Sequence, residues 1–224
     1  MRARSGRWTL LAIVAFVVSS TARPARADTI FTNLAADGSY DCCGGWSVFG
    51  SAYPIATDRA SPFVPAGNYA LDSIDLALTV LAGPSAGDVW LMSDAGGLPG
   101  AILESFHLTN LPTFPSTGTE LASASSTLHP TLMAGVQYWV AVSADGDSYL
   151  SINRNVTGDS GLASRDNDGP WGGGFDPFFV AGAFRVNGTP LPDSEPVPEP
   201  ASLTLLGLGL AGMGARRWRQ RKAY

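Results

Sequence analysis

Residues 73–80 read SIDLALTV, and apolar side chains occupy every second position of this stretch. In an extended chain one face would carry Ile74, Leu76, Leu78 and Val80, and the other would carry Ser73, Asp75, Ala77 and Thr79. A period of two is typical of a strand with one face on a core and the other toward solvent. We therefore predict a half-buried β-strand here.

The same pattern recurs on both sides of this stretch. Residues 137–143 alternate, with Tyr138, Val140 and Val142 opposite Gln137, Trp139, Ala141 and Ser143. Residues 89–92 and 101–108 form a predicted strand pair joined by the eight-residue connection 93–100, and Phe184 and Val186 flank Arg185 in a predicted closing strand. Turn-forming residues separate these runs, and no long amphipathic helical pattern is present. We predict an all-β fold, an antiparallel β-sandwich with a jelly-roll-like or immunoglobulin-like arrangement.

The N-terminus has the three regions of a secretory signal peptide. Arg2, Arg4 and Arg7 precede an apolar run, residues 10–18, and small residues at Ala25 and Ala27 suit signal peptidase. The apolar run is shorter than the roughly 20 residues of a membrane-spanning helix. We expect a signal helix in residues 1–27, removed so that the mature chain begins at Asp28; a retained N-terminal anchor is the alternative.

The C-terminus has a different three-part pattern. Pro198, Glu199 and Pro200 precede residues 201–215, which carry no charge, and a basic cluster fills residues 216–222. A helix of the uncharged stretch would be about 23 Å long, somewhat short of the roughly 30 Å hydrocarbon core. The basic cluster would stay in the cytoplasm, which leaves the preceding chain outside. We expect a short transmembrane helix here, and an ordinary tail anchor is the alternative.

This ending resembles the PEP-CTERM sorting signal over residues 198–224, with Pro198-Glu199-Pro200 as its motif. The resemblance implies an exosortase-type enzyme that cuts near the motif and transfers the body onward. It also implies a Gram-negative-type bacterium that makes extracellular polysaccharide. We divide the chain into the signal peptide, a body of residues 28–190, a Pro-rich acidic linker of residues 191–197 and the sorting tail.

The body is strongly acidic once both ends are removed. Residues 28–197 hold 18 acidic residues, no lysine and the four arginines Arg59, Arg154, Arg165 and Arg185, so their formal charge is −14. Such a surface repels phosphate backbones and anionic lipid, so we expect no nucleic-acid partner.

The body also resembles the choice-of-anchor domains, most closely the R type. The likeness lies in residues 40–46 (YDCCGGW), in residues 93–105 and in residues 182–186 (GAFRV). This family joins one kind of body to different surface-anchoring tails. The resemblance implies an extracellular or cell-surface role and transfers no catalytic residue.

Cys42 and Cys43 are adjacent and are the only cysteines. Exported thiols usually pair, so we expect a vicinal disulfide, which Gly44 and Gly45 would help the backbone accept. Pairing with another chain and two unpaired thiols are the alternatives. A redox catalyst is not expected, because the Cys-x-x-Cys spacing is missing.

Two acidic turns are candidates for calcium, since hard cations prefer oxygen ligands. One contains Asp145 and Asp147, and the other contains Asp166 and Asp168. Neither turn has the remaining ligands of an EF-hand loop, and solvated turns are the alternative. We otherwise expect no cofactor.

Trp171 lies in the glycine-rich residues 169–175 and is the candidate for stacking on a sugar. The alternative is that Trp171 and Phe175 fold back and close one end of the sandwich.

No catalytic constellation is found in the sequence. His107 and His129 are the only histidines, and neither adjoins a nucleophile motif. We therefore expect a non-catalytic surface or matrix protein associated with exopolysaccharide in a biofilm. A calcium-assisted carbohydrate-binding module is the alternative, and a small secreted hydrolase with two carboxylates is the third possibility.

Overall fold

The computed structural model describes residues 27–173 and 179–192. Within these residues the chain forms strands and no helix, and no helix is present that could cross a membrane. The predicted signal peptide up to Arg26, residues 193–197 of the linker and the sorting tail lie outside the described residues. The strands are β1 (Asp28–Thr32), β2 (Asp41–Phe49), β3 (Thr57–Phe63), β4 (Tyr69–Leu76), β5 (Leu78–Ala82), β6 (Ala86–Asp94), β7 (Pro99–Thr109), β8 (Ala122–Ser125), β9 (Thr131–Leu132), β10 (Tyr138–Ala144), β11 (Tyr149–Arg154), β12 (Ala163–Asp166) and β13 (Phe184–Pro190).

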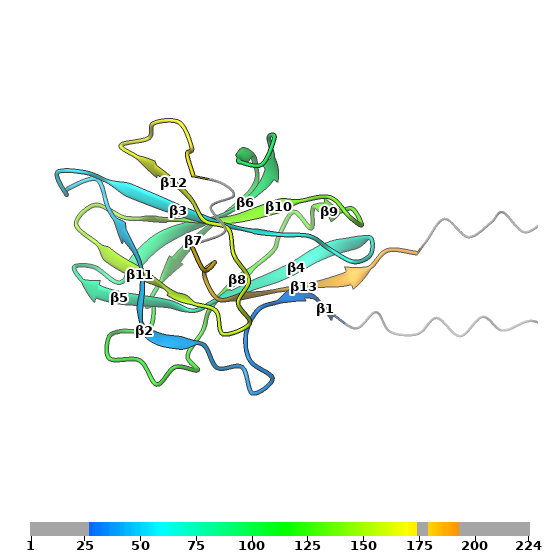
Figure 1. Ribbon diagram of the computed structural model, residues 1–224, viewed down its shortest axis with the longest axis horizontal. Helices are drawn as coiled ribbons and strands as arrows, with labels where there is room; N and C mark the ends of the chain where they lie inside the picture. Colours follow the sequence, from blue (N-terminus) through cyan, green and yellow to red (C-terminus); the bar gives the residue numbers. More distant parts are fainter. Residues whose placement is uncertain (1–26, 174–178, 193–224) are drawn as a thin grey trace, which may run out of the picture.

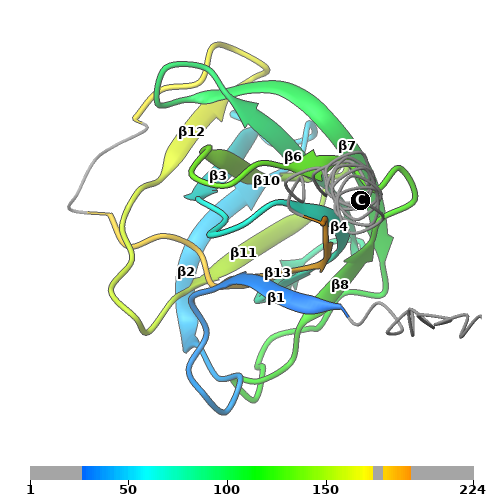
Figure 2. The ribbon, with the colours of Figure 1, turned by 90° about the vertical axis from the view of Figure 1, so that its right-hand side faces the viewer.

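The strands form two sheets that share one core (Figures 1 and 2). The smaller sheet has the order β1-β13-β4-β8, with β9 also paired to β4. The larger has the order β5-β11-β2-β3-β10-β6-β7, with β12 also paired to β3. Every pairing between these strands is antiparallel. The predicted all-β, antiparallel, sandwich-like fold is therefore confirmed, and the choice between the jelly-roll-like and immunoglobulin-like arrangements stays a prediction.

Residues 73–80 form two strands rather than the single strand predicted. The chain passes from the smaller sheet to the larger one at Ala77, between the end of β4 and the start of β5. The Ala77 amide donates to the Ala183 carbonyl (3.0 Å), and its own carbonyl accepts from the Asn153 amide (2.8 Å). The apolar face is buried as predicted, but so are Asp75, Ala77 and Thr79, because other segments cover the second face.

The hairpin of β6 and β7 is confirmed with a shorter connection than predicted. Asp94 pairs with Pro99, so only residues 95–98 join the strands. Gly96 and Gly97 have φ values of 71° and 88°, which glycine adopts at little cost. The Gly97 amide donates to the Asp94 carboxylate (3.0 Å), which holds the turn.

The core contains residues from both sheets. The largest side chains that are fully buried are Trp139, Phe184, Leu71, Ile74, Leu76, Leu78, Leu91, Leu132, Leu150, Val48, Val89 and Val142. Along β10, Tyr138, Val140 and Val142 join the main core, while Trp139 and Ala141 join a second cluster with Ala60, Met92 and Ala163. Both faces of β10 are therefore buried, because β12 and Trp171 contribute to the second cluster.

The two ends of the body lie together. Asp28 at the start of β1 pairs with Gly188 near the end of β13, and Figure 1 shows both ends on the same side of the body. The connection between β2 and β3 projects at the opposite end. This connection therefore lies far from Asp28 and Pro190, where the first and last strands of the body begin and end.

Candidate functional site

The connection between β2 and β3, residues 50–56, is held by both acidic turns. The amides of Gly50 and Ala52 donate to the carbonyls of Ser148 (3.0 Å) and Gly146 (2.8 Å). At its other end, the Ala56 amide donates to the Asn167 side-chain oxygen (3.0 Å), and the Asn167 amide donates to the Ala56 carbonyl (2.9 Å). The turns that the sequence suggested for calcium therefore fix this connection in place.

A pocket of about 420 Å³ opens beside this connection. Its lining is Phe49, Tyr53, Pro54, Ile55, Thr57, Arg59 and Asp166. The Phe49 ring stacks on Tyr149, with ring centroids 4.6 Å apart, and Tyr53 lies 5.1 Å from Phe49. Ile55 is 54% exposed, so one wall of the pocket is an apolar side chain open to solvent.

The polar side of the pocket is an arginine next to a carboxylate. Arg59 donates through Nε to the Ser47 carbonyl (3.2 Å), and Asp166 accepts from the Thr57 hydroxyl (3.1 Å). Burial lowers the pKa of Arg59, and the negative charge of Asp166 acts in the opposite direction. Among the described residues, the terminal nitrogens of Arg59 have no hydrogen-bond partner.

Neither acidic turn predicted for calcium supplies, by itself or with the other, a group of three possible metal ligands among the described residues. Asp147 and Asp168 are exposed, and Asp168 forms an ion pair with Arg165 (3.4 Å). Asp166 is also exposed and lines the pocket, and it belongs to no group of three possible metal ligands among the described residues. Calcium binding stays a prediction.

Asp145 instead joins Asp88 and His107. His107 Nδ1 lies 3.0 Å from Asp88 Oδ1, and its Nε2 lies 3.8 Å from Asp145 Oδ2. In the described part of the chain these three form the only group of three or more histidine, cysteine or acidic residues whose ligand atoms could together reach one metal ion. The Asp88 hydrogen bond, then the Asp145 charge, raise the pKa of His107. A mixed nitrogen and carboxylate set suits a transition metal better than calcium.

Trp171 is partly buried against the second cluster. Backbone hydrogen bonds between Ser164 and Gly172 (2.9 and 2.8 Å) hold its segment beside β12. The guanidinium carbon of Arg165 lies 5.0 Å from the Trp171 ring centroid and 5.1 Å from that of Trp90. Arg165 therefore covers part of the surface that a sugar would need. Sugar stacking at Trp171 stays a prediction, and Phe175 lies outside the described residues.

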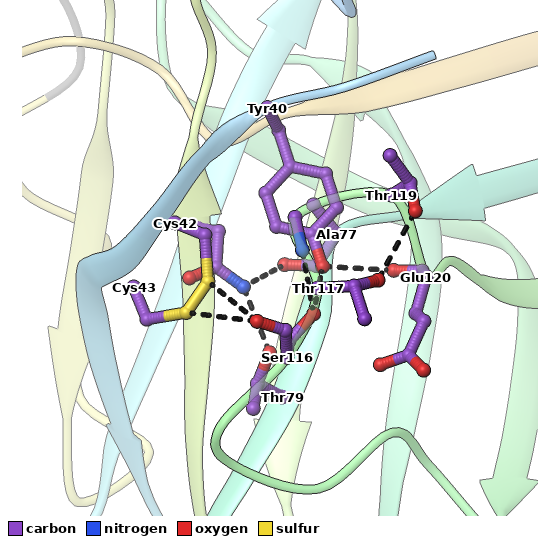
Figure 3. The surroundings of a disulfide bond; sticks show 11 residues. Tyr40, Cys42, Cys43, Ala77, Thr79, Ser116, Thr117, Thr119 and Glu120 are labelled. Atoms are coloured by element: carbon purple, nitrogen blue, oxygen red, sulfur yellow. Dashed lines mark hydrogen bonds between the residues drawn. A yellow bond between two sulfur atoms is a disulfide. The ribbon is translucent and has the colours of Figure 1, made fainter.

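Cys42 and Cys43 are joined by a disulfide on β2 (Figure 3). Their sulfur atoms lie 3.6 and 3.8 Å from the Ser116 carbonyl oxygen. Gly45 lets β2 pack closely on β11, because a Cβ at this position would collide with the Ile152 carbonyl of β11.

Tyr40 fixes the loop that faces the disulfide. Its hydroxyl contacts the Ser116 hydroxyl (2.7 Å) and donates to the Glu120 carbonyl (3.0 Å), as Figure 3 shows. The Tyr40 amide donates to the Gly118 carbonyl (3.0 Å). Tyr40 also packs with Leu34, Ala77 and Cys42. The disulfide is therefore part of a local packing unit between β2 and residues 116–120.

Each of the two histidines contacts a group that accounts for its position in the fold. His107 lies on β7, with the acidic groups described above. His129 has a φ of 47°, and its Nδ1 lies 2.8 Å from the Leu71 carbonyl oxygen.

Two buried or half-buried carboxylates and the aromatic pocket were not predicted from the sequence. Glu104 and Asp94 each accept several hydrogen bonds, although the sequence shows them only as acidic residues in a predicted hairpin. The signal for the pocket in the sequence is the pair Phe49 and Tyr53, which flank a short Gly-Ser-Ala stretch.

Comparison with known families shows what the C-terminus is similar to. Residues 196–221 match the PEP-CTERM protein-sorting motif. No curated protein matches the chain. The predicted sorting signal is thus confirmed, starting two residues before Pro198. The motif marks an exported protein that an exosortase-type enzyme processes from a membrane-anchored precursor and that is sorted to the cell surface.

Proposed function

We propose that residues 28–190 form a non-catalytic body that becomes part of an extracellular polysaccharide layer, as in a biofilm of a Gram-negative-type bacterium. The observation that carries the proposal is the sorting motif at residues 196–221. It follows closely after β13, which ends at Pro190. The short separation supports a body that is delivered as a unit when the tail is removed.

The structure of the body is compatible with this placement. Because β1 and β13 pair side by side, the signal-peptide end and the sorting end leave the body together. The opposite end is free to meet extracellular material. We further propose that the body is of the choice-of-anchor R type, supported by its resemblance in residues 40–46, 93–105 and 182–186.

Sorting is tested with two epitope tags, one within the body and one after Tyr224. In a host with an exosortase, we expect the body tag in the surface fraction without the tail tag. In a matched exosortase deletion, both tags should stay together in the membrane fraction. Intact chain that keeps its last 27 residues in mature surface fractions would contradict the proposal.

Association with polysaccharide is tested in a strain that lacks extracellular polysaccharide synthesis. We expect the processed body to stay in the matrix of the parent strain and to appear in the medium of the deficient strain. The same distribution in both strains would contradict a matrix role while leaving sorting intact.

A further inference from the structure

The pocket between β2, β3 and the turn at Asp166 combines aromatic, apolar and hydrogen-bonding surfaces. We propose that this pocket binds one pyranose unit of a neutral polysaccharide chain. The natural source of that sugar rests on the proposed function, whereas binding itself does not.

The aromatic wall suits the C–H face of a sugar ring. Phe49 lines the pocket and is supported by Tyr149, which stacks on it at 4.6 Å and contacts the Ser47 hydroxyl through its own hydroxyl (3.1 Å). Tyr53 and Ile55 complete this wall. Aromatic side chains bring large contact area at low conformational cost, and Tyr53 adds a polar hydroxyl.

The polar wall offers both a donor and an acceptor. The terminal nitrogens of Arg59 can donate, since among the described residues they bond to nothing. Asp166 uses Oδ1 for Thr57 and has a second oxygen that can accept. Neighbouring sugar hydroxyls both donate and accept, so an arginine–carboxylate pair can satisfy them together.

Charge favours a neutral ligand over an acidic one. Arg59 and Asp166 both line the pocket, so opposite charges stand on the same wall. The formal charge of −14 on residues 28–197 would repel a polyanion at longer range. A neutral sugar is not repelled by the negative charge of the body and needs no net positive charge in the pocket.

The pocket is preformed. The two acidic turns hold residues 50–56 at both ends, as described above. Gly50 packs so closely that a Cβ there would lie 2.4 Å from the Gly146 carbonyl oxygen. A fixed pocket loses less conformational entropy on binding than a mobile one, which favours affinity.

The test uses the exported full chain, purified in detergent, and isothermal titration with cellopentaose, mannopentaose and a galacturonate pentamer. We expect at least one neutral probe to bind. Tyr53→Ala should weaken binding about tenfold or more, because losing one aromatic contact costs about one power of ten in affinity. Ile55→Ala should have a smaller effect.

Ile102→Ala is the matched control, because Ile102 is 51% exposed on β7 and does not line the pocket. We expect it to bind as the parent chain does. Trp171→Ala tests the rival site and should keep measurable binding. Circular dichroism of each variant checks that the fold is retained.

Four results would overturn the proposal: no neutral probe binds, only the galacturonate binds, folded Tyr53→Ala binds unchanged, or Trp171→Ala alone abolishes binding. Fractionation of cells that express Tyr53→Ala tests the proposed function independently of sugar binding. If the variant is sorted to the surface but no longer binds sugar, the pocket is responsible for binding and sorting does not depend on it. If a chain that binds sugar is not sorted, the proposed function is wrong and the pocket proposal stands.

Discussion

Glu104 is a buried carboxylate on β7 that holds the segment after β8. It is 4% exposed and accepts hydrogen bonds from the Ser126 hydroxyl (2.6 Å) and from the amides of Thr127 (2.7 Å) and Leu128 (3.0 Å). Burial alone would raise its pKa, but these hydrogen bonds outweigh burial and hold the pKa below the ordinary value. Glu104 thus works as an ionised acceptor for a turn.

We predict that Glu104→Ala lowers the free energy of unfolding by about 2–3 kcal/mol, because buried donors lose their acceptor. Urea denaturation at neutral pH measures this. Glu120→Gln, at an exposed side chain, is the control and should change the free energy little. Equal stability of Glu104→Ala and the parent chain would contradict the role assigned to Glu104.

The pH dependence of the same group has a definite sign. Because the folded pKa of Glu104 is lowered, its contribution is present above the unfolded pKa and is lost as pH falls through the folded pKa. We predict that Glu104→Gln makes the loss of stability in acid shallower below about pH 4.3, the ordinary range of glutamate. Thermal unfolding across this range measures it, and identical slopes in the two proteins would show the prediction to be wrong.

The cysteine pair gives a second prediction about individual residues. Cys42 and Cys43 are bonded to each other and lie against the Ser116 carbonyl. We predict that denatured, non-reduced exported protein takes up no maleimide and that reduction yields two labelled thiols per chain. Two labelled thiols before reduction would contradict the vicinal disulfide. A covalent dimer on a non-reducing gel would favour pairing between chains.

At the scale of elements, a partly buried ion pair reinforces the backbone pairing of β12 with β3. Arg165 Nε lies 2.7 Å from Asp58 Oδ2, and the two side chains are 19% and 9% exposed. Arg165 also lies over the rings of Trp90 and Trp171. The guanidinium therefore joins β12, β3 and the segment that carries Trp171.

We predict that Arg165→Met costs about 3 kcal/mol, because it leaves the Asp58 carboxylate buried without a partner. The double variant Asp58→Asn, Arg165→Met should recover part of this loss. Urea denaturation of the parent chain, the two single variants and the double variant gives the coupling free energy between Asp58 and Arg165. Hydrogen exchange should show that β12 opens first in Arg165→Met. Additive effects of the two single variants would contradict a direct interaction.

At the scale of the whole molecule, excess negative charge opposes the compact state. Residues 28–197 carry a formal charge of −14. Raising NaCl from about 10 mM to about 150 mM shortens the screening length from about 30 Å to about 8 Å. Repulsion across the surface should weaken accordingly.

We predict that the melting temperature of the exported chain rises with NaCl over this range. KCl at the same ionic strength is the control and should act equally. A falling melting temperature would show that ion pairs outweigh repulsion. CaCl₂ at matched ionic strength tests the calcium prediction, since a bound ion adds stability beyond screening and no extra rise would contradict it.

Local patterns along the sequence were enough to predict the export route and the β-strands of this protein. The sorting motif is a local pattern that a processing enzyme reads along the chain, so residues 196–221 suffice to identify it. Alternating side chains likewise predicted strands at residues 73–80, 137–143 and 184–186, because side-chain direction alternates along any extended chain. The choice-of-anchor resemblance of the body stays a prediction.

Only the tertiary structure decided which surfaces meet. Ala77 became a crossing between sheets because segments distant in sequence, at Asn153 and Ala183, supply its hydrogen bonds. The pocket joins Phe49 and Arg59 to Asp166, more than a hundred residues further along, because β12 pairs with β3. A periodic pattern specifies which face of a strand is apolar, but strand neighbours depend on long-range pairing. The grouping of side chains into a site is therefore set by the three-dimensional fold.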